Sequence, residues 1–100
     1  MQNNPLEPIK KHDPDFLGHI EQGRNLAFEP GALGKKEKLL IAIAVDASHG
    51  AVNGVRSLTL QALDAGATKD EVMEALRVAG FISGAASVYT AAAGLQDITF

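Results

Sequence analysis

Hydrophobic side chains recur at steps of three and four residues along most of this chain, the spacing that places them on one face of an α-helix. The first such segment spans residues 14–28, where Asp13 can cap the N-terminus and Pro14 suits the first helical position. Its apolar face consists of Phe16, Leu17, Ile20 and Ala27. The preceding residues 1–12 are polar and contain two prolines, so we expect a flexible arm there.

The most apolar run, residues 38–45, predicts a helix that is hydrophobic on nearly every side and therefore central in the fold. Residues 34–37 have the pattern of a helix start, and residues 48–50 end the helix. A buried strand would also fit this run, but the rest of the chain shows no strand or hairpin pattern that could pair with it. A third helix is predicted over residues 51–63, with an apolar face made of Val52, Val55, either Leu58 or Thr59, and Ala62.

Two further helices are predicted over residues 69–81 and 85–95. Their apolar faces consist of Val72, Leu76 and Ala79 in the first, and Ala85, Val88, Ala92 and Leu95 in the second. Gly66 ends the helix before them, and Thr68 and Glu71 form a capping box, in which each side chain pairs with the backbone N–H of the other residue. The pattern predicts an all-α fold, a single domain over residues 13–100 with about five helices.

The chain has 100 residues, of which 46% are hydrophobic, enough for one small core. Nine Lys and Arg residues against twelve Asp and Glu residues give a net charge of -3, which disfavours nucleic acid and anionic membranes as partners. Cysteine is absent, which excludes disulfides, thiolate metal sites and thiol redox chemistry. The N-terminal residues lack the apolar segment of a secretory signal, so we expect a cytoplasmic protein.

Residues 78–96 carry no charge and are rich in Ala and Gly. We do not expect them to span a membrane, because their glycines and hydroxyl side chains would be costly in hydrocarbon. Small side chains instead allow helices to approach closely, both within a subunit and between subunits. Because much of the hydrophobic content is Ala, one chain buries little apolar surface by itself, and we expect it to self-associate.

Three segments, in this order, resemble the carboxymuconolactone decarboxylase and alkylhydroperoxidase D-like superfamily. They are LGKKEKLLIA (residues 33–42), ALDAGATKDEV (residues 62–72) and the Gly/Ala-rich last helix. The resemblance extends over about residues 13–97, nearly the whole of the chain expected to be ordered. It implies an all-helical bundle that assembles into trimers or hexamers.

Peroxidase members of this superfamily carry Cys-x-x-Cys-x-x-His at the start of the third helix and a Glu early in the second. In this chain the cysteine positions fall on Ala51 or Val52 and on Gly54 or Val55. The His position falls on Ser57 or Leu58, and the Glu position on Leu39 or Leu40. All four groups are missing, so the resemblance implies a member without thiol peroxidase activity.

The decarboxylase branch needs no cysteine, so a carboxy-lyase that acts on a small carboxylated lactone or aromatic acid stays open. Loss of CO2 requires a cation for the carboxylate, a donor that polarises the substrate and a proton source. His49, between the second and third helices, is the candidate catalytic residue, and Arg56, whose guanidinium can hold a carboxylate by two hydrogen bonds, is the candidate substrate-binding residue. The alternatives are a helix C-terminal histidine favoured by the dipole and an arginine on a solvated helix face.

Other polar residues fit structural roles better than functional ones. His19 fits a partly buried structural histidine, and Tyr89 fits either the core or a pocket. Asp46 needs a partner if it is buried, which Arg56 could provide, and otherwise faces solvent. The lysines at the start of the second helix either extend into water or form an anion-binding rim; they are Lys35, Lys36 and Lys38. Residues with the spacing of metal ligands are missing, so we expect neither a metal nor another cofactor.

The sequence alone leaves two functions open. One is a non-thiol lyase with a small anionic substrate, and the other is a catalytically inactive oligomer of the same superfamily that acts by binding and assembly. Polar side chains around a cavity near residues 49–58 would favour the enzyme, and aliphatic filling would favour the second function.

Overall fold

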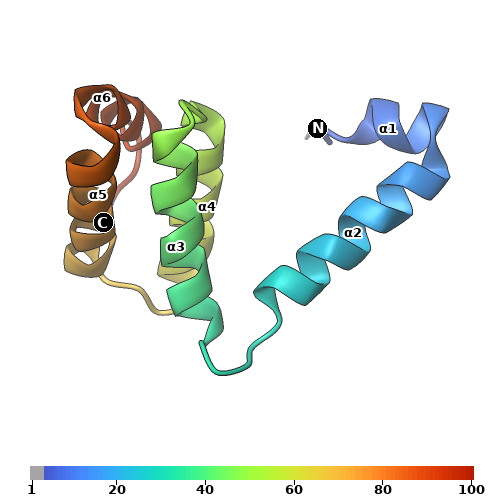
Figure 1. Cartoon of the computed structure of the whole chain (residues 1–100), viewed down its shortest axis with the longest axis horizontal. Helices are drawn as coiled ribbons and strands as arrows, with labels where there is room; N and C mark the ends of the chain where they lie inside the picture. Colours follow the sequence, from blue (N-terminus) through green and yellow to red (C-terminus); the bar gives the residue numbers. More distant parts are fainter. Residues whose placement is uncertain (1–3) are drawn as a thin grey trace.

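The computed structural model describes residues 4–100, and six α-helices account for most of them (Figure 1). They are α1 (Glu7–His12), α2 (Pro14–Phe28), α3 (Lys35–Ser48), α4 (Val52–Asp64), α5 (Lys69–Ser83) and α6 (Ala85–Gly94). Residues 4–100 contain no strand, so the predicted all-α class is confirmed. The predicted helices are all present, each within about two residues of its predicted bounds, and α1 is an additional one.

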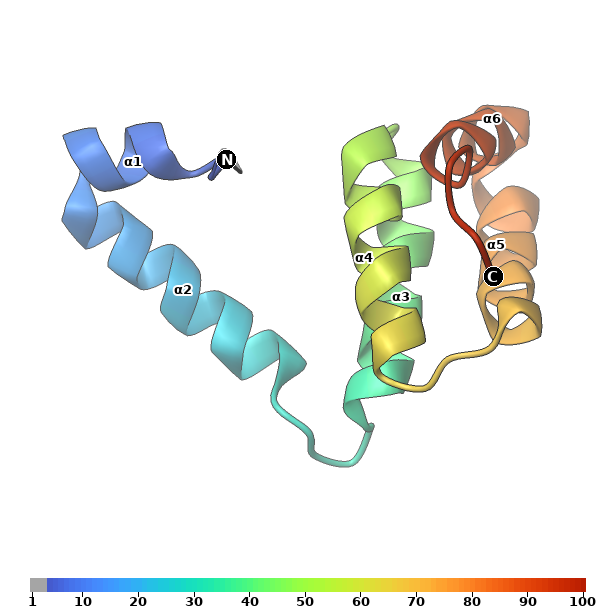
Figure 2. The same ribbon diagram turned by 180° about the vertical axis from the view of Figure 1, so that it is seen from behind.

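Helices α3 to α6 pack together as a bundle, whereas α1 and α2 stand away from it (Figures 1 and 2). From here on, the arm means these two helices together, residues 7–28, and not residues 1–12 alone. Helix α3 is central in the bundle and contacts α4, α5 and α6. Its Leu39, Ile43 and Ala47 are buried at steps of four residues, as expected for the helix predicted to be central. Helix α4 adds Val55, Thr59 and Ala62 to the core, α5 adds Val72, Leu76 and Ala79, and α6 adds Ala91.

Helices α3 and α5 are joined by a polar pair near each end. At one end Lys36 Nζ donates to Glu71 Oε2 at 2.9 Å, and at the other Ser83 Oγ donates to Ser48 Oγ at 2.9 Å. Both pairs join residues that are 35 positions apart in the chain. The two helices therefore run parallel and keep the same register along their length.

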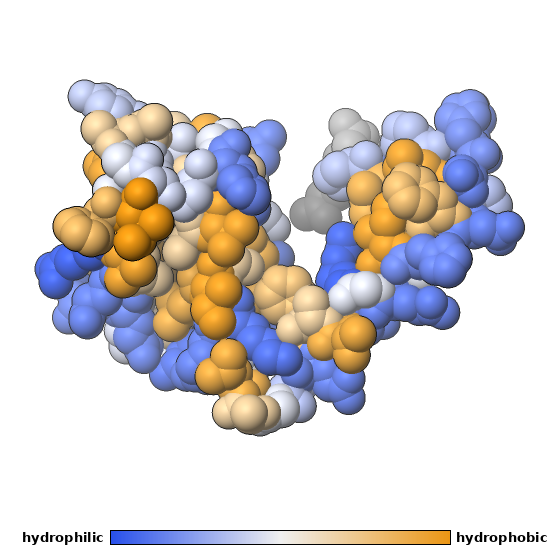
Figure 3. All heavy atoms as spheres, viewed as in Figure 1, coloured by the Kyte–Doolittle hydropathy of each residue, from blue (hydrophilic) through white to orange (hydrophobic). Residues whose placement is uncertain are grey.

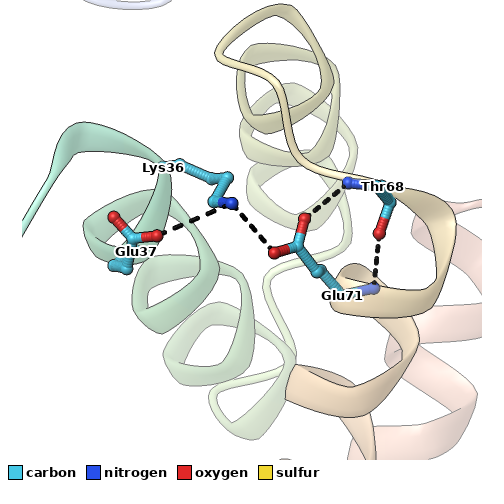
Figure 4. Close-up of polar contacts among 4 residues, drawn as sticks. All are labelled: Lys36, Glu37, Thr68 and Glu71. Carbon is cyan, nitrogen blue, oxygen red and sulfur yellow. Dashed lines mark hydrogen bonds and ion pairs between the residues drawn. The ribbon is translucent and has the colours of Figure 1, made fainter.

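The predicted capping box begins helix α5 (Figure 4). Thr68 Oγ1 accepts from the Glu71 N–H at 3.1 Å, and Glu71 Oε1 accepts from the Thr68 N–H at 2.9 Å. The hydrogen bond from Lys36, and after it the one from the Thr68 N–H, holds the pKa of Glu71 below its ordinary value of 4.5. The same contact with Glu71 raises the pKa of Lys36 above 10.5.

Helix α6 buries a different face from the predicted one. Ser87 and Gly94 are buried, whereas Val88 is exposed. The Ser87 hydroxyl is satisfied inside the bundle, because it donates to the Gly84 carbonyl oxygen at 2.7 Å. Gly94 lies so close to α4 that a Cβ there would be 2.7 Å from Val55 Cβ. The prediction was wrong by one residue because close helix contact, and not apolar spacing, sets this register.

Residues 7–12 form helix α1, although the sequence predicted no ordered element before Asp13. Glu7 lies in the first turn and basic residues lie in the last, an order of charges that the helix dipole favours. Asp13 ends α1 and caps α2 as predicted, since its Oδ1 accepts from the Phe16 N–H at 3.1 Å. Leu17 is the buried residue of α2, so the rest of its predicted apolar face stays outside the core. Residues 1–3 lie outside the described residues, and the division into segments 1–12 and 13–100 stays a prediction.

Gly66 and Gly84 lie where the sequence predicted helix breaks. Their φ angles of 96° and 86° are in the left-handed region, which glycine adopts without steric penalty. Gly84 divides the uncharged residues 78–96 between α5 and α6. Among the described helices, none combines the length and apolarity needed to cross a membrane.

Candidate functional site

A hollow of about 910 Å³ lies between the arm and the bundle, where Figure 3 shows an open notch. The arm and the loop after it form one wall, and α3 and α4 form the other. The bundle wall includes Leu39, Asp46, Gly54, Ser57, Leu58 and Gln61. A hollow of this size can hold a small organic molecule.

Helix α4 presents one stripe of residues to the hollow. The stripe follows the helical spacing and consists of Gly54, Ser57, Leu58 and Gln61. Gln61 Nε2 donates to Ser57 Oγ at 3.2 Å, so the two polar side chains of the stripe are joined. Val55, Thr59 and Ala62 lie on another face of α4 and are buried in the core. Helix α4 therefore has one packed side and one side that can contact a ligand.

Asp46 of α3 lies directly over Gly54 of α4. Its side chain is half-buried, and a Cβ at residue 54 would overlap Asp46 Oδ2 and lie 2.8 Å from Asp46 Cγ. The carboxylate thus occupies the space that any side chain at residue 54 would need. Residue 54 is in the first turn of α4, whose N-cap Ala51 makes no side-chain hydrogen bond. The carboxylate therefore lies beside the N-terminal turn of α4.

Charges of both signs line the rest of the hollow. Arg24 of α2 and Lys35 of α3 are exposed cations, and Glu29 is an exposed carboxylate in the loop between these helices. The loop is tied to α3, because Lys38 Nζ donates to the Glu29 backbone oxygen at 2.6 Å. Lys36 instead pairs with Glu71 and Glu37 (Figure 4). Of the three lysines considered as an anion-binding rim, Lys35 is the one that lines the hollow.

The two predicted site residues lie outside the lining of the hollow. His49 is exposed at the C-terminus of α3, where its backbone N–H donates to the Val45 carbonyl oxygen at 3.1 Å. Arg56 is exposed on α4, and its Nη1 donates to Asp97 Oδ2 at 3.2 Å. Arg56 thus pairs with Asp97 and not with Asp46. The polar residues that converge on the hollow are a different set.

Two further predictions about polar residues are wrong. His19 is exposed on α2 and not partly buried, because this helix stands away from the bundle. Tyr89 lies neither in the core nor among the lining residues of the hollow and is 78% exposed. The register of α6, which turns Ser87 and Gly94 inward, turns Tyr89 outward.

Sequence reasoning missed Ser57 and Gln61 as site residues and left the role of Asp46 open. A signal for the first two was available, since they share a helix face with Gly54 that is distinct from the face of Val55 and Ala62. No pattern within a single segment of the sequence predicts the angle between the arm and the bundle. That angle creates the second wall and thereby turns an exposed helix face into a hollow.

Some of the alternatives at which the resemblance places peroxidase groups line the hollow, namely Leu39, Gly54, Ser57 and Leu58. Val55, the other alternative for the second cysteine, is instead buried in the core. The residues at these positions supply no thiol, imidazole or carboxylate.

Comparisons with known proteins agree with the resemblance. Residues 14–97 match the family model of the Carboxymuconolactone decarboxylase family. Among solved structures, the chain is similar to apo-lpg0406, a carboxymuconolactone decarboxylase family protein from Legionella pneumophila. The TM-score is 0.85 and the sequence identity 27%, over 91% of this chain and 81% of that chain. The comparison with curated proteins gives no match.

Proposed function

Because the chain belongs to the carboxymuconolactone decarboxylase family, we propose that it is a non-thiol carboxy-lyase that takes a small carboxylated lactone or aromatic acid into the hollow. The observation that supports this most is the convergence of polar side chains there. Asp46, Ser57 and Gln61 come from the bundle, and Arg24 comes from the arm. The sequence contains no cysteine, so the reaction proceeds through these other groups.

Each wall of the hollow supplies part of what a decarboxylation needs. Arg24 and Lys35 are cations at its edge that can hold the carboxylates of a substrate. The Ser57 hydroxyl and the Gln61 amide are donors that can polarise a carbonyl oxygen and stabilise the charge that develops on it. Apolar surface for the ring of the substrate comes from Phe28, Leu39 and Leu58.

The test is turnover of a substrate panel by the wild type and by matched variants. Release of CO2 is measured with carboxylated butenolides and hydroxybenzoates. Arg24→Ala and Lys35→Ala are expected to raise KM about tenfold or more with a smaller change in kcat, because they remove binding that does not change during the reaction. Release of CO2 from none of the substrates would overturn the proposal.

The same assay tests the assignment of catalysis to His49 and of substrate binding to Arg56. If the hollow is the site, His49→Ala and Arg56→Ala keep kcat and KM close to those of the wild type. Loss of turnover in these two variants, with normal turnover in Arg24→Ala and Lys35→Ala, would place the active site at the junction of α3 and α4. It would overturn the proposal that the hollow is the active site.

We further propose that the chain forms a homo-oligomer, a trimer or a hexamer. Phe81 and Ile82 of α5 are 87% and 74% exposed, Tyr89 of α6 is 78% exposed, and Leu26 of the arm is 75% exposed. Large apolar side chains in such numbers are typical of a contact surface. The arm supports the same conclusion, because a lone helix of 15 residues is marginally stable in water. Light scattering at micromolar concentration is expected to give the mass of three or six subunits, and a monomer would overturn this proposal.

The exposed apolar residues also favour a second function, that of a catalytically inactive protein acting by binding and assembly. Both functions require the oligomer, so the oligomeric state does not distinguish them. Turnover of a substrate does, because only the enzyme releases CO2. Leu26→Glu and Phe81→Glu place a charge in the proposed contact and are expected to lower the mass, whereas Lys69→Glu, at an exposed polar position, leaves it unchanged. An intact oligomer that turns over none of the panel substrates would favour this second function.

A further inference from the structure

We infer that Asp46, as a carboxylate, makes the hollow selective for aromatic acids that carry a hydroxyl group at the end of the molecule far from their own carboxylate. The inference rests on the proposed function and narrows its substrate class to extended hydroxy-aromatic acids. Asp46 is thereby a specificity-determining residue, because its negative charge selects the ligand and takes no part in proton transfer.

The contact between α3 and α4 places this carboxylate. Asp46 Oδ2 lies where a Cβ at residue 54 would be, and only glycine leaves that space empty. The Ala51 Cβ is 3.5 Å from the same Cβ position, which closes the space on the side of the helix N-terminus. Asp46 and Gly54 both line the hollow, so the carboxylate is open to a ligand from that side.

The carboxylate of Asp46 has acceptor capacity to spare. Within residues 4–100 its oxygens accept no side-chain hydrogen bond and take part in no ion pair. In the ionised form that an aspartate has at neutral pH, both oxygens accept hydrogen bonds and neither donates. Glu29, the other carboxylate of the lining, is exposed at the edge and keeps its water when a ligand binds, whereas Asp46 is half-buried in the bundle wall.

A ligand that fills the hollow displaces the water from Asp46 and must replace the hydrogen bonds that this water made. A ligand without a donor leaves a charged acceptor unpaired, which is costly. A phenolic hydroxyl group is a strong donor to a carboxylate. An ether oxygen at the same place would instead bring two acceptors together. The hollow therefore favours the hydroxyl compound over its methyl ether.

The charges of the lining fix the direction of the ligand. Asp46 repels the ligand's own carboxylate, whereas Arg24 and Lys35 attract it. Lys35 and Asp46 lie eleven residues apart on α3, which is about 16 Å at the rise of an α-helix. The flexible lysine side chain covers part of this distance, and an aromatic ring with a short carboxylated chain covers the rest. Helix α4 lies along α3 (Figures 1 and 2), and its Ser57 and Gln61 line the space between the two ends.

The test is calorimetric binding of two pairs of acids, each pair differing in one methyl group. The long pair is 4-hydroxycinnamate and 4-methoxycinnamate, and the short pair is 4-hydroxybenzoate and 4-methoxybenzoate. The wild type is expected to bind 4-hydroxycinnamate about tenfold or more tightly than its methyl ether, the effect of one hydrogen bond to a charged group. The preference is expected to be less than about threefold for the short pair, which does not reach both ends.

Two substitutions test the role of Asp46 from different sides. Asp46→Asn keeps the shape of the side chain, but its amide can donate to an ether oxygen, so the preference within the long pair is expected to fall below about threefold. Gly54→Ala keeps the carboxylate but displaces it, and the same fall is expected. The matched controls are Asp64→Asn, which removes an exposed carboxylate, and Gly23→Ala, whose added Cβ has no atom within 4 Å. Both controls are expected to keep the wild-type preference.

The outcomes distinguish this inference from the proposed function. A wild-type preference below threefold for the long pair would overturn the inference, as would an undiminished preference in Asp46→Asn. If Asp46→Asn loses its helical circular dichroism, Gly54→Ala decides in its place. Both results leave the lyase function to be decided by release of CO2. The expected preference in a wild type that releases no CO2 would overturn the lyase function and support the selectivity of the hollow. Binding of none of the four acids would overturn both.

Discussion

Replacement of Gly94 by alanine tests the packing of α6 on α4. An added Cβ would lie 2.6 Å from Val55 Cγ1, 2.7 Å from Val55 Cβ and 3.0 Å from the Val52 carbonyl oxygen. Carbon atoms in contact are ordinarily about 3.5–4.0 Å apart, so the overlap is about 1 Å on a buried side chain. The oxygen belongs to the backbone, which cannot rotate away, and the two helices must therefore separate.

The magnitude follows from two opposing terms. Overpacking of a core costs about 1–3 kcal/mol, and the better helix propensity of alanine offsets up to about 1 kcal/mol. We expect Gly94→Ala to lower the free energy of unfolding by about 1.5 kcal/mol. For a chain of 100 residues this corresponds to a Tm lower by about 6–12 °C.

Urea unfolding followed by circular dichroism checks the value at one fixed protein concentration, since assembly makes stability depend on concentration. Gly23→Ala is the matched control, because its Cβ has open space, and its stability is expected to equal or exceed that of the wild type by up to about 1 kcal/mol. A Gly94→Ala protein as stable as Gly23→Ala would refute the close packing of α6 on α4.

Three other predictions concern single polar contacts. Thr59 Oγ1 is fully buried and has no hydrogen-bond partner within the described residues, so Thr59→Val is expected to stabilise the fold by about 1 kcal/mol in urea unfolding; destabilisation would show that the hydroxyl has a partner. The pKa of Glu71 is lowered in the folded state, so its carboxylate contributes stability that is present above pH 4.5 and lost as the pH falls through the folded pKa. The Tm difference between the wild type and Glu71→Gln is therefore expected to be constant from pH 7 to pH 5 and to shrink below about pH 4.5, and a difference independent of pH would contradict the contact with Lys36. Arg56→Ala removes an exposed ion pair with Asp97 and is expected to cost less than about 1 kcal/mol at low salt, so a larger loss would contradict the exposure of this pair.

Local signals account for most of what the sequence predicted correctly. Asp13 and the pair of Thr68 and Glu71 act through side-chain hydrogen bonds to the nearby backbone, and they lie at the helix starts expected of them. Gly66 and Gly84 act through their own backbone conformation and lie at the predicted helix ends. The buried faces of α3 and α5 follow the apolar spacing, because large aliphatic residues dominate there. The family resemblance predicted the arrangement of the helices in the whole fold, which these local signals do not determine.

The wrong predictions share a different cause, because they concern features that depend on contacts between helices. Helix α6 is rich in small residues, so spacing does not distinguish its faces, and the close approach of Gly94 to α4 decides which one is buried. His19 is exposed because α2 leaves the bundle, a direction that depends on the loop and on no pattern within the helix. The hollow and the position of Asp46 over Gly54 depend on the same three-dimensional contacts.

The account rests most on the hollow as the place where a carboxylated ligand binds. Titration of the isotope-labelled wild type with benzoate, followed by amide chemical shifts in two-dimensional NMR, measures this directly. We predict saturable shifts that are largest at Gly54, Ser57 and Gln61 and small at His49. Shifts centred on His49 and Arg56, or no saturable shift at all, would contradict the account.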